Sequence, residues 1–359
     1  MPVQSAFTLN PNEIFASIAN MIISQEVFAD NLGKHQTLVD KARVDGGLYG
    51  DKKLYYATDV LESHPWGNDA EAANLLALDR PADPEVQAIT LDVFRQIRLT
   101  VDNYLSKRAW SDEGAFSSFN SIMLGWMRET KRVYDGTLYN VFIGCTKSAE
   151  TAQNREVAVK GLTDAKEEAM IIAQNLADLM VEMGDYSRDF NDYGNLRSYA
   201  EDGIKVIWNS KFVNKIRKID LPTIFHKDGL VDKFDEDVLP ARYFGSIVSS
   251  AVTAEANDGT YRSLLEKDYT VSNVKTHVFP GDKIPAGAAI QAGESYKEDA
   301  DVICKVLVKL PPYMSAFEVG TSFFNPRSLT ENHYLTFGHN TLEYLKNYPF
   351  ITVKAVNAA

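Results

Sequence analysis

Hydrophobic positions recur every three or four residues between residues 112 and 145, the spacing of one face of an α-helix. The members of this stripe are Phe116, Phe119, Met123, Trp126, Met127, Val133, Tyr134, Leu138, Val141 and Phe142. The pattern predicts a helix about 50 Å long at about 1.5 Å per residue, with Gly136 as a point where it bends or splits. Such a length suits a spine that spans an elongated subunit, and the first four residues of the stripe are its expected core.

Two further segments carry helix signals. Residues 164–183 begin with Asp164 and Glu167 at capping-box spacing and are followed by Gly184, a residue favoured at helix C-termini. Near the N-terminus, Asn10-Pro11-Asn12-Glu13 is typical of a helix start. The apolar stripe that follows it consists of Ile14, Phe15, Ile18 and Ile22. We expect either a core helix or an N-terminal arm that packs on a partner chain.

Short β-prone runs occupy much of the remaining chain. They cover residues 204–208, 273–279, 302–310 and 350–356, and a basic amphipathic helix is predicted at 210–218. Because these runs do not alternate regularly with helices, the predicted class is α+β. The length of 359 residues is typical of about two domains.

Residues 38–82 have a different character. Turn signals at Asp45-Gly46-Gly47 and Gly50-Asp51 flank a β-prone run at residues 53–58, and Pro65 and Pro81 follow. The tyrosines of this stretch are Tyr49, Tyr55 and Tyr56. A hairpin with many aromatic and few aliphatic residues is hard to bury in its own domain, so we expect a projecting loop. The alternative is an ordinary surface hairpin.

Charge and cysteine content exclude several classes of protein. The net charge of −12 argues against a nucleic-acid binder that works by charge neutralisation. Two cysteines without a CxxC motif argue against a disulfide scaffold or a structural zinc site. The first 33 residues contain no Lys or Arg, and no apolar run is long enough to cross a bilayer. We therefore expect a soluble protein made in the cytosol, without a membrane partner.

Candidate catalytic and ligand-binding motifs are weak. No phosphate-binding, zincin or nucleophile-elbow motif is present. His226, Asp228 and Asp232 form an acidic loop without EF-hand spacing, and His333 and His339 are six residues apart, which is too far for one tetrahedral ion in a regular strand. A small basic patch is formed by Lys211, Lys215, Arg217 and Lys218. We interpret all three as structural features and expect no enzyme activity, cofactor or metal.

Three stretches of the chain resemble major capsid proteins of tailed phages, those of the Hong Kong 97-type fold. The first runs from Val86 to Phe142 and holds Phe94-Arg95-Gln96. The second runs from Asn191 to Ser198 and continues to Lys205–Asn209 and Leu221–Phe225. The third is Phe324-Asn325-Pro326-Arg327-Ser328-Leu329, followed by an aromatic run that begins at His333. Their order along the chain is similar to that of small short-tailed, picovirus-like phages.

The resemblance implies an α+β fold with an N-terminal arm, an extended loop, a spine helix, a peripheral domain and an axial domain. It places these as follows: arm, 1–37; extended loop, 38–82; peripheral domain with the spine, 83–159; axial domain, 160–314; closing strands of the peripheral domain, 315–359. The loop residues Gly46, Gly47, Tyr49, Tyr55 and Tyr56 would contact a neighbouring subunit, and Gly46, Gly47 and Gly50 would let the loop swing. Ile14, Phe15 and Ile18 of the arm would brace an adjacent subunit.

The function implied is that of a structural head protein. Copies would assemble into pentamers and hexamers of an icosahedral shell that encloses double-stranded DNA without sequence specificity. Its partners would be itself, scaffolding proteins and a portal protein, and its location the virion capsid, assembled in the host cytoplasm. Two alternatives stay open: an encapsulin-like cage, and a two-domain metal-dependent hydrolase that uses His226, Asp228 and Asp232.

Overall fold

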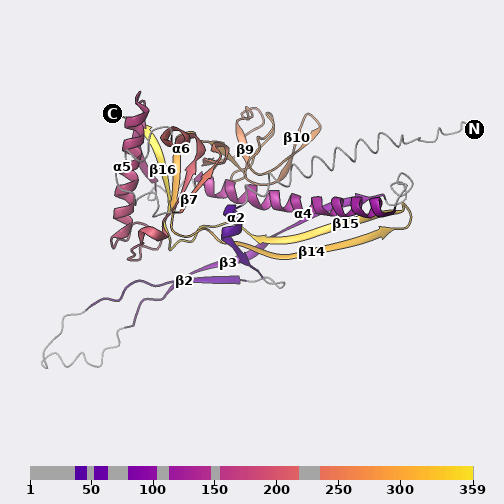
Figure 1. The fold of residues 1–359 in the computed structure, drawn as a ribbon, viewed down its shortest axis with the longest axis horizontal. Helices are drawn as coiled ribbons and strands as arrows, with labels where there is room; N and C mark the ends of the chain where they lie inside the picture. Colours follow the sequence, from indigo (N-terminus) through magenta and orange to yellow (C-terminus); the bar gives the residue numbers. More distant parts are fainter. Residues whose placement is uncertain are drawn as a thin grey trace, which may run out of the picture. The chain divides into compact units, whose positions relative to one another are not determined.

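The computed structural model describes residues 37–46, 52–63, 80–102, 113–146, 154–217 and 235–358 (Figure 1). The predicted N-terminal helix, with Ile14, Phe15 and Ile18, lies outside these residues. The chain folds into two compact units. Unit 1 contains Met1–Asp51, Leu91–Asn140 and Tyr313–Thr341, and unit 2 contains Lys52–Thr90, Val141–Pro312 and Leu342–Ala359. Both units are discontinuous in sequence, because the chain passes between them several times.

Unit 1 combines a long helix with a sheet. Helix α4 (Glu113–Gly144) is one unbroken helix, so the predicted spine is confirmed and Gly136 does not split it. The sheet order is β1-β14-β15-β3, and a short helix, α2, precedes β1. The bounds are α2, Thr37–Ala42; β1, Arg43–Asp45; β14, Tyr313–Asn325; β15, Thr330–Asn340; and β3, Glu85–Val101, of which residues 91–101 belong to this unit.

Strands β14 and β15 form an antiparallel hairpin, and α4 lies along them (Figure 1). The Asn-Pro-Arg motif is the turn of this hairpin. The side-chain oxygen of Asn325 accepts a hydrogen bond from the Arg327 N–H at 3.1 Å, and Leu329 adopts a left-handed φ of 57°. Tyr134 of α4 packs against Phe337 of β15, with ring centroids 5.8 Å apart. Aromatic side chains therefore join the helix to the sheet.

The main sheet of unit 2 has the order β5-β16-β13-β6-β7. All residues of β6 and β13 are buried, which explains why both are rich in apolar residues, although Lys205, Asn209 and Lys305 are buried with them. Helices α5 and α6 pack on this sheet, and Figure 1 shows α5 beside β16. The bounds are β5, Asn154–Lys160; α5, Ala165–Gly184; β6, Lys205–Asn209; α6, Ser210–Arg217; β7, Asp235–Leu239; β13, Val302–Leu307; and β16, Phe350–Asn357.

Smaller elements complete unit 2. A four-stranded sheet has the order β4-β8-β12-β9, β10 and β11 form a separate hairpin, and β2 pairs with residues 85–90 of β3. The bounds are β2, Lys52–Ala57; β4, Cys145–Thr146; η3, Glu201–Gly203; η4, Ala241–Tyr243; β8, Gly245–Ile247; β9, Tyr261–Ser263; β10, Lys267–Val271; β11, Val274–Val278; and β12, Ser295–Glu298. The predicted mixture of helices and strands is confirmed.

The cap predicted for α5 is present. Asp164 is the N-cap residue, and its side chain accepts a hydrogen bond from the Lys166 N–H at 2.9 Å. The buried face of α5 packs with β6, β13 and β16 in the largest hydrophobic cluster of unit 2. A local sequence signal and the tertiary packing thus agree at this helix.

Candidate assembly interface

The histidine of the sheet in unit 1 has a structural role. His339 is buried on β15, where Nε2 lies 2.9 Å from the Tyr134 hydroxyl and Nδ1 lies 2.8 Å from the Asn340 carbonyl oxygen. Burial is the main cause that lowers the pKa of His339, so the imidazole is neutral at pH 7. Nδ1–H then donates to the carbonyl, and the Tyr134 hydroxyl donates to Nε2. A hydrogen-bonded strand histidine, as predicted, occupies this position.

Metal and membrane features are absent from the part of the chain that the structure describes. Within it, no group of three or more His, Cys, Asp or Glu side chains could hold a metal ion. No helix there is long and apolar enough to span a bilayer. His226, Asp228 and Asp232 lie outside the described residues.

The aromatic residues beside the predicted basic patch face the interior. Trp208 and Phe212 are buried in the core of unit 2, whereas Lys211 is exposed. Stacking on nucleic-acid bases needs exposed rings, so these two residues do not provide it. The side chains of Lys215 and Arg217 and the whole of Lys218 lie outside the described residues, so the interpretation of the patch as a solvated helix face stays a prediction.

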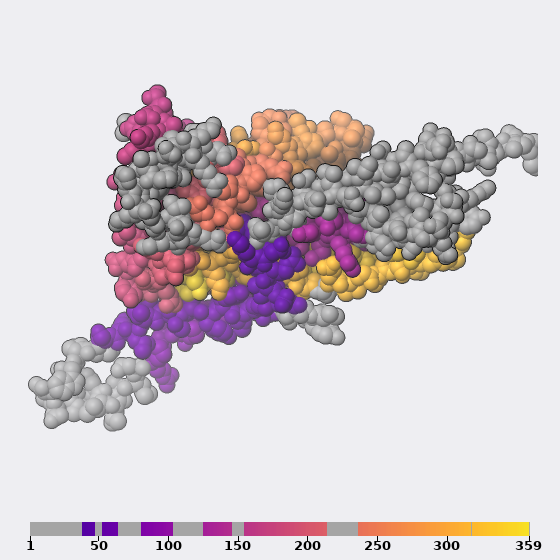
Figure 2. Space-filling view, in the orientation of Figure 1, coloured from indigo at the N-terminus to yellow at the C-terminus, as the bar shows by residue number. Residues whose placement is uncertain are grey.

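The ribbon formed by β2 and residues 85–90 of β3 carries an exposed apolar face. The register places Leu54 opposite Ala88 and Tyr56 opposite Val86, and because side chains alternate along a strand, these four share one face. Leu54, Tyr56 and Val86 are 45%, 64% and 46% exposed. Both strands lie at the surface in Figure 2, in indigo and violet. An apolar strand surface left open to water is a feature typical of interaction sites.

The opposite face of this ribbon is fixed to the body of unit 2. The Lys309 ammonium lies 5.7 Å from the centre of the Tyr55 ring. Gln87 is buried; its amide donates to the Tyr344 carbonyl at 2.9 Å and accepts from the Lys346 N–H at 3.0 Å. The two adjacent tyrosines of β2 therefore face opposite sides, and one of them faces solvent.

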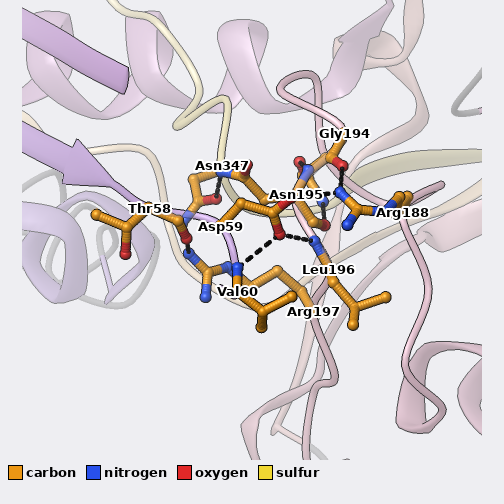
Figure 3. Close-up of polar contacts among 10 residues, drawn as sticks. Thr58, Asp59, Val60, Arg188, Gly194, Asn195, Leu196, Arg197 and Asn347 are labelled. Atoms are coloured by element: carbon orange, nitrogen blue, oxygen red, sulfur yellow. Dashed lines mark hydrogen bonds and ion pairs between the residues drawn. The ribbon is translucent and has the colours of Figure 1, made fainter. Parts of the chain in front are cut away.

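The chain that leaves β2 is held by a loop that follows α5 (Figure 3). The Asp59 carboxylate accepts a hydrogen bond from the Leu196 N–H at 2.9 Å and forms an ion pair with Arg188 at 2.5 Å. The Arg197 guanidinium donates to the Thr58 carbonyl oxygen at 2.5 Å. We call these five residues the clasp. It sets the direction in which the chain leaves the ribbon.

The loop that provides the clasp is itself well ordered by internal hydrogen bonds. Ser187 and Arg197 exchange two backbone hydrogen bonds of 3.0 Å. The Asn191 side chain bonds both the N–H and the carbonyl of Asn195, at 2.9 and 2.7 Å, and Gly194 between them adopts φ +67°. The motif Asn191–Ser198, noted in the sequence for its resemblance, thus forms a hydrogen-bonded loop that contacts Thr58 and Asp59.

Loss of the Asp59 carboxylate is expected to open the clasp and detach the chain after β2 from the loop that follows α5. Hydrogen bonds to the carboxylate lower the pKa of Asp59 from 3.8 to about 2. The largest effect comes from the Leu196 N–H, and smaller ones come from Arg188 and the Val60 N–H. Because the pKa is lower in the folded state, the contribution of Asp59 to stability is complete above pH 3.8 and disappears as the pH falls through about 2.

At pH 7, Asp59→Ala should speed proteolytic cleavage at residues 58–63 several-fold, measured by mass spectrometry of the fragments.

The control for this experiment is Asp83→Ala, which removes an exposed carboxylate outside the clasp. We expect it to leave the cleavage rate unchanged. Equal cleavage rates for wild type and Asp59→Ala would show that the clasp does not hold the chain.

Gly46, which the sequence analysis assigned to the extended loop, belongs to the packed part of unit 1, and its predicted contact with a neighbouring subunit stays a prediction. Its N–H donates to the Ser315 carbonyl oxygen at 3.0 Å, continuing the pairing of β1 with β14. A Cβ here would lie 3.0 Å from side-chain atoms of Met314 and Ala316, so this close approach favours glycine. Buried Leu38 and Val39 of α2 lie in the same packed unit, in a stretch expected to be loop.

The described residues cover only some of the other predicted loop and spine residues. Gly47, Tyr49 and Gly50 lie outside the described residues, as do the side chains of Phe116, Phe119 and Met123. Trp126 is half-buried. The fully buried residues that α4 contributes lie further along the helix, and they include Tyr134, Tyr139, Val141 and Ile143.

A buried polar cluster in unit 1 was not found from the sequence. Asp135 of α4 is 1% exposed; its carboxylate accepts from the Tyr313 hydroxyl at 2.6 Å and pairs with Lys131 at 3.1 Å and Arg43 at 3.4 Å. Lys131 also lies 3.5 Å from Glu318. The i,i+4 spacing of Lys131 and Asp135 was visible in the sequence, but their burial was not. The cluster ties β1 and β14 to α4.

Comparisons with known proteins were made by sequence and by structure. No family model and no curated protein matches the sequence. Among solved structures, a chain of the capsid of Staphylococcus phage Andhra aligns with a TM-score of 0.52 and 10% identity, covering 86% of this chain and 80% of that one. The chain has a phage capsid fold. The resemblance seen in the sequence is thereby confirmed at the level of fold.

A second solved structure aligns over a similar share of the chain. A chain from the structure of the head fiber and inner core protein gp22 of native bacteriophage P68 aligns with a TM-score of 0.55 and 10% identity, covering 86% of this chain and 83% of that one. Both alignments span most of the chain, as expected if the whole capsid fold is present.

Proposed function

We propose that this chain is a structural major capsid protein that self-assembles into an icosahedral shell. The observation that carries the proposal is the fold shared with the Andhra capsid chain over 86% of the sequence. In such a protein the function lies in contacts between copies. The exposed apolar face of the ribbon, with Leu54, Tyr56 and Val86, is our candidate for one of these contacts.

The ribbon has the properties that a contact surface between subunits needs. Its exposed face combines aliphatic side chains with a tyrosine, which buries a large area and keeps a polar group at its tip. Its other face and the clasp hold it in place, so little conformational entropy is lost on binding a neighbouring copy. We propose that residues 38–82 contribute this contact through β2 and that the arm, with Ile14, Phe15 and Ile18, adds a second one.

Finer features of the proposal extend the resemblance. The shell would consist of pentamers and hexamers, enclose double-stranded DNA and resemble the heads of picovirus-like phages. Scaffolding and portal proteins would be its partners, with assembly in the host cytoplasm. A chain with a net charge of −12 would repel packaged DNA weakly and so let it slide during filling. An inner shell surface mapped as basic would contradict this role of the charge.

Sedimentation of the purified protein, with negative-stain images of the heaviest fraction, tests the proposed function. We expect megadalton shells, tubes, or rings of five or six copies. A discrete two-fold dimer that does not change with concentration would contradict the proposal. An encapsulin-like cage would also sediment as a shell, but its particles would contain protein cargo in place of DNA, which mass spectrometry and nucleic-acid staining distinguish.

A further inference from the structure

Lys305 is a lysine in the middle of the unit 2 sheet. It lies on β13 between two partner strands, opposite Ile207 of β6 and Thr352 of β16. Its exposed fraction is 1%, although lysine is almost never fully buried without an ionic partner. Its surroundings therefore have to replace the hydrogen bonds that the Lys305 amine would otherwise make with water.

The contacts of the Lys305 amine are polar but uncharged. Its Nζ donates to the Thr352 hydroxyl oxygen at 2.6 Å and to the Cys145 carbonyl oxygen at 3.3 Å, and lies 5.1 Å from the centre of the Phe350 ring. No carboxylate in the described part of the chain forms an ion pair with it. A neutral amine has two N–H groups, and both find an acceptor here. An ammonium has a third, and Nζ makes no third hydrogen bond within the described residues.

Among the titratable groups around Lys305, Lys354 favours the neutral amine, whereas Cys145 and Cys304 act in the opposite direction. The Cys145 and Cys304 thiols stay protonated, because burial raises the pKa of each well above its usual range. Lys354 of β16 carries a like charge and is itself paired with Asp299 at 3.1 Å. Burial is the largest effect on Lys305 and, together with Lys354, lowers its pKa from 10.5 to about 7.

The acceptor at Cys145 lies where α4 ends. Gly144 is the last residue of the helix, and β4, which begins at Cys145, pairs in parallel with β8. The helix end approaches η4 so closely that a Cβ on Gly144 would lie 2.2 Å from the Tyr243 carbonyl oxygen. The hydrogen bond from Lys305 thus joins the end of a tightly packed helix to the centre of the sheet.

We propose that Lys305 is a neutral-amine lock that holds the C-terminal end of α4 on the unit 2 sheet, and that protonation of this amine opens the lock. The ammonium needs a third acceptor and water, and it obtains both when the segment around Cys145 moves away from β13. Mild acid then loosens this joint without breaking any ion pair. The lock concerns the conformation of one chain and does not depend on the proposed assembly.

The pH dependence of stability in Lys305→Met tests the lock. Between pH 7 and 9 the unfolded wild type binds more protons than the folded form, so its stability rises with pH, whereas methionine does not titrate. From pH 7 to pH 9, the melting temperature of the wild type should therefore rise by about 5 to 9 °C more than that of Lys305→Met. Lys283→Met, which removes an exposed lysine, should follow the wild type at each pH. A constant difference between Lys305→Met and wild type would overturn the proposal.

A second measurement needs only the wild-type protein. Amide hydrogen exchange, corrected for its intrinsic pH dependence, should show that residues 141–146 lose protection between pH 8 and pH 6. The amides of α5, in the same unit, should keep theirs and serve as the internal control. Equal protection of residues 141–146 at both pH values would contradict the lock even if Lys305→Met fails to fold.

Discussion

Replacing Asp135 with alanine is expected to destabilise the chain by about 3–5 kcal/mol, the usual cost of removing one partner of a buried ion pair. The variant leaves the Lys131 ammonium without its nearer carboxylate and removes the acceptor of the Tyr313 hydroxyl, and both groups are buried. It also removes the nearer of the two carboxylates that pair with Arg43 at the start of β1. Urea unfolding followed by tyrosine and tryptophan fluorescence measures the change.

Two matched variants separate this effect from a general loss of charge. Asp40 also pairs with Arg43, at 3.6 Å, but its side chain is 57% exposed, so Asp40→Ala should cost less than about 1 kcal/mol. The double variant Lys131→Met with Asp135→Leu removes both buried charges and should recover part of the lost stability. Equal costs for Asp135→Ala and Asp40→Ala would show that the buried cluster does not stabilise unit 1.

Placing carboxylates on the exposed face of the ribbon is expected to abolish assembly and leave the subunit folded. Leu54→Asp combined with Tyr56→Asp changes two exposed side chains, so the melting temperature should stay within about 2 °C of wild type. In the proposed contact the same carboxylates would be buried without a partner, which is strongly unfavourable. Sedimentation should then show subunits or small oligomers where the wild type forms large particles.

Val274→Asp is the control for this prediction. Val274 is 65% exposed on β11 of the same unit, so the substitution has the same chemistry on a strand outside the ribbon. It should assemble like the wild type. Normal particles from the Leu54→Asp and Tyr56→Asp double variant would mean that this ribbon does not form the contact.

The elements that the sequence predicted well are those with strong local signals. The stripe in α4 and the capped stripe in α5 recur at helical spacing, and both helices end within one residue of the predicted positions. The runs in β6, β13 and β16 are equally clear, because β6 and β13 are buried at every position and β16 at four of its eight. Strand β3 alternates in exposure, whereas β14 is buried at its start and exposed from Glu318 to Phe324, so only parts of both were noticed.

Glycine at residue 46 shows the limit of such local interpretation. In the sequence, Asp45-Gly46-Gly47 is a turn signal and suggested a freely swinging loop. In the fold, Gly46 lies beside β14, from which it is separated by about 270 residues of chain, and close packing there favours glycine. The same residue type serves both purposes, and only the tertiary contact distinguishes them.

The sequence by itself determined helices α4, α5 and α6, most of the buried strands and the order of motifs that indicates a phage capsid fold. These depend on periodicity, caps and turns, which act over a few residues. The tertiary structure alone decided which charged groups are buried, which face of β2 stays exposed and how the chain leaves the ribbon. The pairings of Asp59 with Leu196, Asp135 with Tyr313 and Lys305 with Cys145 join residues 137, 178 and 160 positions apart. No local pattern encodes such pairings, because each forms only when the whole fold brings its two segments together.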